Sequence, residues 1–103
     1  MKQVNTLNSY SLRLPYKKDK KGNVLELIWS EGPTTIISAE KLRQACPCAS
    51  CRTTKIKILP EVEILEIYPV GRYALNFLFS DNHNLGIYTY AYLRSLDESQ
   101  DGI

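Results

Sequence analysis

Apolar residues recur at every second position where the central part of the chain begins. Leu25, Leu27 and Trp29 alternate with other residues, which places them on one face of an extended strand. A Gly-Pro turn at residues 31–33 follows, and then the β-branched run 34–37. This order predicts a β-hairpin whose first strand buries one face.

The second half of the chain repeats this pattern. A strand at 62–68, a turn at 69–72, a middle strand, a turn at 80–84 and a return strand at 85–88 succeed one another. The middle strand alternates most strongly, with apolar residues at Tyr73, Leu75, Phe77 and Phe79. We expect this row to be the most buried face of the protein.

Two short helices are predicted from capping residues. Ser38 stands where an N-cap accepts hydrogen bonds from the first turn, and the helix should end near Cys46 because Pro47 disfavours a helical conformation at the preceding residue. Thr89 is placed to cap the second helix. Helical spacing gives apolar faces at Ala39, Leu42, Ala45 and Cys46 and at Tyr92, Leu93 and Leu96, with Lys41, Arg43 and Gln44 facing water.

Together these elements predict a small α+β domain, an antiparallel or mixed β-sheet built of hairpins with two short helices. The domain spans residues 23–97. Residues 1–22 form a basic lead-in, disordered in part, with a short strand at 11–14, and residues 98–103 form a frayed tail. The charge run 17–22 is interpreted as a solvated loop tip; contact with a phosphate or an acidic partner is the alternative.

Composition narrows the class of protein. The chain has 103 residues, 44% hydrophobic and 23% charged, which is an ordinary globular composition. Its net charge of +2 is too small to predict a nucleic-acid-binding surface. It has neither an apolar run of about 18 residues that would cross a membrane nor a signal-peptide core at its start. We therefore expect a cytoplasmic protein that binds neither nucleic acid nor membranes.

The candidate chemistry lies in one short cluster and one distant residue. Cys46, Cys48 and Cys51 are the only cysteines of the chain, and His83 is its only histidine. A tetrahedral zinc site needs four such ligands, and in the reducing cytosol a tight cysteine cluster is more typical of metal binding than of disulfides. The sequence predicts one zinc per chain in a Cys3His site that links the first helix to the second hairpin. Buried thiols without a metal are the alternative.

Charged neighbours suit such a site. Three thiolates and a neutral imidazole leave a Zn²⁺ site with a net negative charge, which basic residues nearby in the sequence would offset. These residues are Arg43, Arg52, Lys55 and Lys57, and plain surface solubility is their alternative role. Asp81 either orients the imidazole of His83 or stabilises its turn.

Two other uses of the thiols stay open. Thiolates with histidine also hold iron–sulfur clusters, although Cys-x-Cys-x2-Cys lacks the usual ferredoxin spacings. A redox dithiol ranks third, because Cys48 and Cys51 form a Cys-x-x-Cys pair only inside the triplet.

Several stretches resemble the N-terminal-like domain of gamma-butyrobetaine hydroxylase, a family that also includes free-standing small bacterial proteins. The similar segments are residues 37–43, 46–52, 69–75, 79–83 and 86–88, in the family order. The resemblance implies a small β-rich module with a structural zinc, held here by Cys46, Cys48, Cys51 and His83. Many free-standing relatives lack the cysteines, and this chain departs from the family at Asn82, where glycine is usual.

We expect no enzymatic activity. One histidine cannot build the two-His, one-carboxylate iron site of the larger hydroxylases, and no convincing base supports a zinc hydrolase or thiol oxidoreductase. We expect a zinc-stabilised module that binds a protein partner, with Tyr88, Tyr90 and Tyr92 as candidate exposed contacts. Ordinary core packing is the alternative for at least half of these tyrosines, and a homodimer stays open. Similar domains are attached to P-loop ATPases that carry iron–sulfur clusters, so an accessory factor in cluster assembly or delivery, working with such a carrier, is the alternative.

Overall fold

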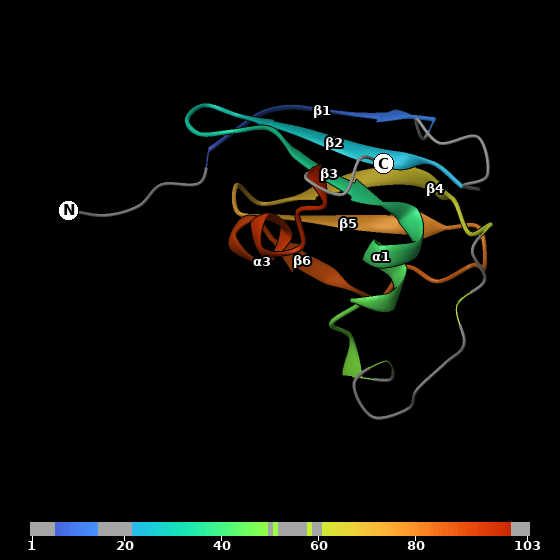
Figure 1. The fold of residues 1–103 in the computed structure, drawn as a ribbon. Coiled ribbons are helices and arrows are strands. Elements are labelled where there is room, and N and C mark those ends of the chain that lie inside the picture. Colours follow the sequence, from blue (N-terminus) through green and yellow to red (C-terminus); the bar gives the residue numbers. More distant parts are fainter. Residues whose placement is uncertain (1–5, 15–21, 50, 52–57, 59–60, 100–103) are drawn as a thin grey trace.

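The computed structural model describes residues 6–14, 22–49, 51, 58 and 61–99. Within these residues, six strands form two three-stranded antiparallel sheets, accompanied by the short helices α1 and α3 (Figure 1). The predicted α+β architecture of hairpins and short helices is confirmed. Much of the predicted lead-in, most of the charge run 17–22 and the end of the predicted tail lie outside the described residues.

The first sheet contains, in spatial order, β1 (Leu7–Arg13), β2 (Val24–Trp29) and β3 (Thr35–Ser38). Leu25 and Leu27 are fully buried and Trp29 is nearly so, which confirms the predicted inner face of the hairpin. The strand expected at 11–14 begins earlier, at Leu7, and pairs with β2. These residues of the predicted lead-in therefore form an edge of the sheet.

The second sheet contains, in spatial order, β4 (Ile64–Val70), β5 (Ala74–Phe79) and β6 (Ile87–Thr89). Leu75, Phe77 and Phe79 are buried as predicted, with at most 1% of their surface exposed. Tyr73 is 58% exposed, so the prediction is wrong at this position. Tyr73 lies in the turn before β5, where the alternation of a paired strand does not apply.

Pro69 lies within β4 and not in the turn that the sequence predicts at 69–72. It pairs with Leu75, and the turn begins only at Gly71, whose φ is +58°. An edge strand accepts proline because one row of its backbone N–H groups has no partner strand. β4 is such an edge in the order of the second sheet.

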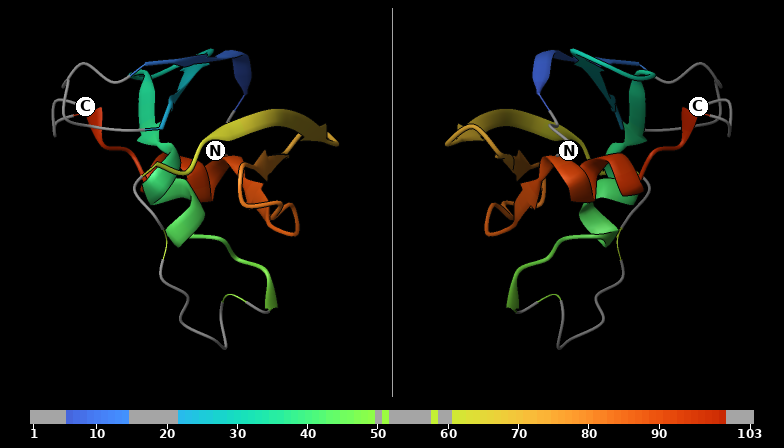
Figure 2. Two further views of the ribbon diagram at one scale, coloured as in Figure 1. Left: turned by 90° about the vertical axis from the view of Figure 1, so that its right-hand side faces the viewer. Right: turned by 90° about the vertical axis from the view of Figure 1, so that its left-hand side faces the viewer.

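The helices begin at the predicted caps. The Ser38 hydroxyl accepts a hydrogen bond from the Lys41 N–H (3.2 Å) at the start of α1 (Ala39–Gln44). The Thr89 hydroxyl accepts one from the Tyr92 N–H (3.1 Å) at the start of α3 (Tyr90–Ser95). Both helices lie on the same side of the first sheet (Figure 2), and Leu42 and Leu93 anchor them in the core that both sheets share.

Two of the three tyrosines expected to be exposed are buried. Tyr88 has 0% and Tyr90 8% of its surface exposed, so neither is an exposed contact and the core-packing alternative holds for both. Tyr88 points inward from β6, packs edge-on against Phe77 and donates a hydrogen bond to the Leu42 carbonyl (2.7 Å). Its phenol group therefore ties β6 to α1.

Among the described residues, the helices are too short and too polar to span a bilayer.

Candidate metal centre

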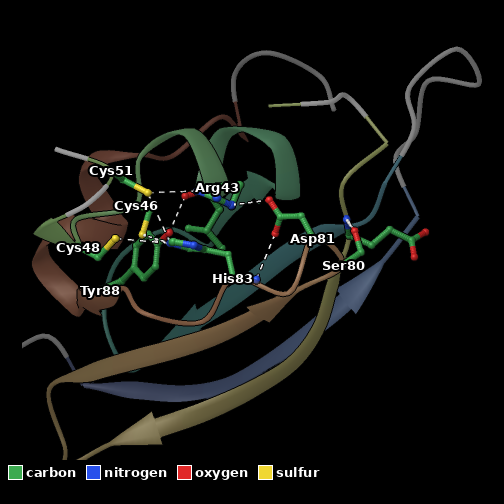
Figure 3. Close-up of polar contacts among 10 residues, drawn as sticks. Arg43, Cys46, Cys48, Cys51, Ser80, Asp81, His83 and Tyr88 are labelled. Carbon is green, nitrogen blue, oxygen red and sulfur yellow. Dashed lines mark hydrogen bonds and ion pairs between the residues drawn. The ribbon is translucent and has the colours of Figure 1, made fainter. Parts of the chain in front are cut away.

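The structure brings the four predicted ligand residues together. Cys46 follows α1 directly, Cys48 and Cys51 lie in the segment after it, and His83 comes from the loop between β5 and β6. Figure 3 shows the three sulfur atoms grouped around one end of the imidazole ring. Cys46 is buried, and the other three residues are partly buried.

The distances describe one tight cluster. The Nε2 atom of His83 lies 3.2 Å from Sγ of Cys46, 3.5 Å from Sγ of Cys48 and 3.4 Å from Sγ of Cys51. The four ligand atoms all lie within 4.8 Å of one another. A neutral imidazole nitrogen carries one proton or one lone pair, so it cannot satisfy three thiols by hydrogen bonds. A single ion between the four atoms would contact them all, and the group is therefore able to hold a metal.

Gly86 makes room for the first sulfur, a role that the sequence reasoning missed. A Cβ atom at Gly86 would lie 2.7 Å from Sγ of Cys46 and 3.0 Å from Cδ of Pro47. Real Cβ atoms do not approach neighbours so closely, so a larger residue would push the sulfur away. The one signal in the sequence is the glycine itself, because a residue without a Cβ atom allows the backbone to approach a neighbour closely.

The turn before His83 is held by its own backbone and by Asp81. Asn82 adopts a left-handed conformation with φ +66°, which asparagine tolerates. The Asp81 carboxylate accepts a hydrogen bond from the backbone N–H of His83 (3.3 Å). Asp81 thus acts on the turn, the second of the two roles that the sequence allowed.

Arg43 was expected to face water, and the structure contradicts this. It is 4% exposed, because its side chain lies between the cysteine segment and the turn that carries Asp81 and His83. Its Nε donates to Oδ2 of Asp81 (2.9 Å) and its Nη1 donates to Sγ of Cys51 (3.3 Å). The other basic residues expected to offset the site's charge, Arg52, Lys55 and Lys57, lie outside the described residues.

Burial sets the protonation of the metal-free site. It raises the pKa of the Cys46 thiol to about 12. Burial, together with the positive charge of Arg43, lowers the pKa of His83. At neutral pH His83 is therefore a neutral imidazole, the form that binds metals, whereas Cys46 must give up a proton when a metal binds.

A shallow cavity of about 330 Å³ lies beside Cys46 and is lined also by Pro47, Ile87, Thr89 and Tyr92. Of the three tyrosines expected to contact a partner, Tyr92 is the one that reaches this surface. Its hydroxyl group donates to the Ala45 carbonyl (2.6 Å), which fixes the ring beside the site.

The fold and the site define a small two-sheet α+β domain with a Cys3His group able to hold a metal ion. The chain belongs to the family described as gamma-butyrobetaine hydroxylase-like, N-terminal, whose model matches residues 2–94. This match confirms the resemblance drawn from the sequence. A search of the curated proteins found no match.

Solved structures share the fold. A crystal structure of a protein of unknown function from Acidithiobacillus ferrooxidans, assigned to the DUF971 family, is 38% identical; the alignment covers 85% of this chain and 90% of that one, with a TM-score of 0.64. Two structures solved in solution by NMR are 27% and 29% identical. The first alignment covers 94% of this chain and 72% of the other (TM-score 0.71), and the second covers 88% and 77% (TM-score 0.57).

Proposed function

We propose that this protein is a small, non-enzymatic, cytoplasmic module that binds one Zn²⁺ through Cys46, Cys48, Cys51 and His83 and presents the stabilised domain to a protein partner. The observation that carries the proposal is the convergence of three sulfur atoms on one imidazole nitrogen, each within 3.5 Å of it.

The distances support zinc. Bond lengths of about 2.3 Å to sulfur and 2.0–2.1 Å to nitrogen, at tetrahedral angles, separate the sulfur and nitrogen ligands by about 3.6 Å. The observed separations of 3.2–3.5 Å are slightly shorter, so small outward movements would complete the site. An iron–sulfur cluster spreads its ligands around several irons, and the tight grouping around one point favours a single ion.

The connectivity supports a structural role. The histidine is 32 to 37 residues away from the cysteines along the chain, so a bound ion would close a long loop between α1 and the β5–β6 hairpin. Four protein ligands complete a tetrahedral site and leave no position for water, whereas a catalytic zinc keeps one position open. Free energy of metal binding would then add to folding free energy.

The test is metal analysis of the protein purified without added metal, by elemental analysis and visible absorption. The proposal expects a colourless protein with about one zinc per chain. His83→Ala should lose most of this zinc, whereas Asn84→Ala, in the same exposed loop, should keep it. A brown protein with iron and labile sulfide would favour the iron–sulfur accessory role instead, and a protein with neither metal would overturn both.

A further inference from the structure

We infer that Arg43 is a positioning residue of the metal centre. It holds the ligands Cys51 and His83 at fixed positions relative to each other and balances the negative charge of the metal-bound thiolates. This inference rests on the proposed function, because it requires a metal in the site. It concerns a residue outside the four ligands. The sequence placed Arg43 on the water-facing side of the helix and among the basic residues near the site; its contacts with Cys51 and Asp81 come from the structure.

A continuous chain of polar contacts connects the two ligand-bearing segments. Arg43 donates through Nη1 to the Cys51 sulfur (3.3 Å) and through Nε to Oδ2 of Asp81 (2.9 Å). The other oxygen of Asp81 accepts from the backbone N–H of His83 (3.3 Å). Figure 3 shows the guanidinium group between the cysteine segment and the turn. Because arginine's fork is rigid and planar, one side chain fixes both neighbours at once.

The charges explain why a buried cation is stable there. With 4% of its surface exposed, the guanidinium group has lost most of its water, and burial of an unpaired charge is costly. Asp81 supplies one negative charge at ion-pair distance. Three thiolates around a divalent cation add a further net negative charge beside Arg43, so the loaded site and the arginine stabilise each other.

A hydrogen bond from Arg43 to the Cys51 thiolate would change the metal affinity and the electronic properties of the site. A cationic donor to a coordinating thiolate withdraws electron density from the sulfur and fixes its direction. Residues that hold ligands in this way typically contribute about 10–100-fold in metal affinity. The arginine is therefore expected to set both the affinity of the site and the electronic character of the Cys51 ligand.

The experiment compares Arg43→Gln and Arg43→Lys with Arg94→Gln as the matched control. Arg94 is also an arginine with a structural contact, since it stacks 4.4 Å from the Trp29 ring centre and donates to the Glu31 carbonyl, but it does not touch a candidate ligand in the described residues. Zinc affinity is measured by competition with a chromogenic chelator, and Co²⁺-loaded protein is examined by visible spectroscopy.

Arg43→Gln should weaken zinc binding about 10–100-fold and move the sulfur-to-cobalt charge-transfer band to longer wavelength, because Cys51 loses its hydrogen bond. Arg43→Lys should recover part of the affinity, since it keeps the charge but not the fork. Arg94→Gln should leave both measurements unchanged. If Arg43→Gln does not fold, Asp81→Asn removes the ion pair without a change of size and should weaken binding in the same direction.

The outcomes separate the two claims. If the unaltered protein binds neither zinc nor cobalt, the proposed function fails. If it binds both metals, and Arg43→Gln keeps the affinity and the spectrum of the Arg94→Gln control, the proposed function stands and the role of Arg43 is overturned.

Discussion

Gly86 and Cys46 lie so close that a single added carbon at Gly86 would come within 2.7 Å of the Cys46 sulfur. The two residues belong to different halves of the fold, since Cys46 follows α1 and Gly86 precedes β6. The Cys46 sulfur is the one nearest to His83. Its position therefore depends on the close approach of the Gly86 backbone as well as on the segment that carries Cys46.

We predict that Gly86→Ala lowers metal affinity, because the added methyl group displaces the Cys46 sulfur from the ion. Overpacking of this kind also costs about 1–3 kcal/mol of folding free energy. The measurement is zinc content together with the thermal midpoint. Gly32→Ala is the control: its φ of +93° makes alanine strained, but its Cβ would meet only Arg94, at 3.6 Å or more. Equal zinc in both variants would contradict the role of Gly86.

Removal of the metal should destabilise the protein. Since the proposed ion joins segments 32 to 37 residues apart, its loss removes binding free energy that adds to folding. A loss of a few kcal/mol lowers the thermal midpoint of a domain of this size by roughly 10 °C or more. Calorimetry before and after treatment with a strong chelator measures this shift, and added Zn²⁺ should reverse it. An unchanged midpoint after complete zinc removal would rule out a structural role.

The metal-free protein should lose stability at alkaline pH. Burial raises the pKa of Cys46 from its ordinary value of 9.0 to about 12. The unfolded chain therefore releases this proton at a lower pH than the folded chain. The stabilising contribution is complete below pH 9.0 and is lost as the pH rises towards about 12. Buried Tyr88, whose pKa is also raised, changes stability in the same direction.

Denaturant melts of the chelated protein at several pH values test this prediction. Cys46→Ala serves as the comparison, because it removes the Cys46 contribution and keeps that of Tyr88. The fall in stability above pH 9 should be smaller in Cys46→Ala. Identical pH profiles for the two proteins would show that the thiol is not held in its protonated form by burial.

A fourth prediction concerns the core alone. The indole N–H of Trp29 donates to the buried Thr35 hydroxyl (2.8 Å). Thr35→Val keeps the shape but leaves this donor unpaired, which costs about 1–3 kcal/mol. Urea unfolding should show this loss, with zinc content unchanged, and Thr34→Val should show a much smaller one. A Thr35→Val protein as stable as the unaltered chain would mean that the indole finds another partner.

Local patterns predicted much of this fold because they reflect local physics. Alternation at Leu25, Leu27 and Trp29 identified a buried strand face, and Ser38 and Thr89 identified the helix starts, since caps act over three residues. Counting soft ligands in the sequence also named the four residues that the structure brings together.

The predictions for Arg43 and Tyr88 differ from the structure because their burial depends on distant partners. Arg43 is buried because Asp81 lies 38 residues further along and supplies the opposite charge. Tyr88 is buried because its hydroxyl reaches the Leu42 carbonyl of α1, 46 residues away. Helical or strand periodicity assigns a face to a side chain, but tertiary contacts decide whether that face is covered.

The central claim is that one Zn²⁺ joins the three cysteines to His83. Its most direct test is X-ray absorption spectroscopy at the zinc edge of the protein purified without added metal. The account predicts about one zinc per chain with three sulfur neighbours at about 2.3 Å and one nitrogen at about 2.0–2.1 Å, and loss of the nitrogen contribution in His83→Ala. A zinc bound mainly by oxygen, or a spectrum unchanged in His83→Ala, would contradict it.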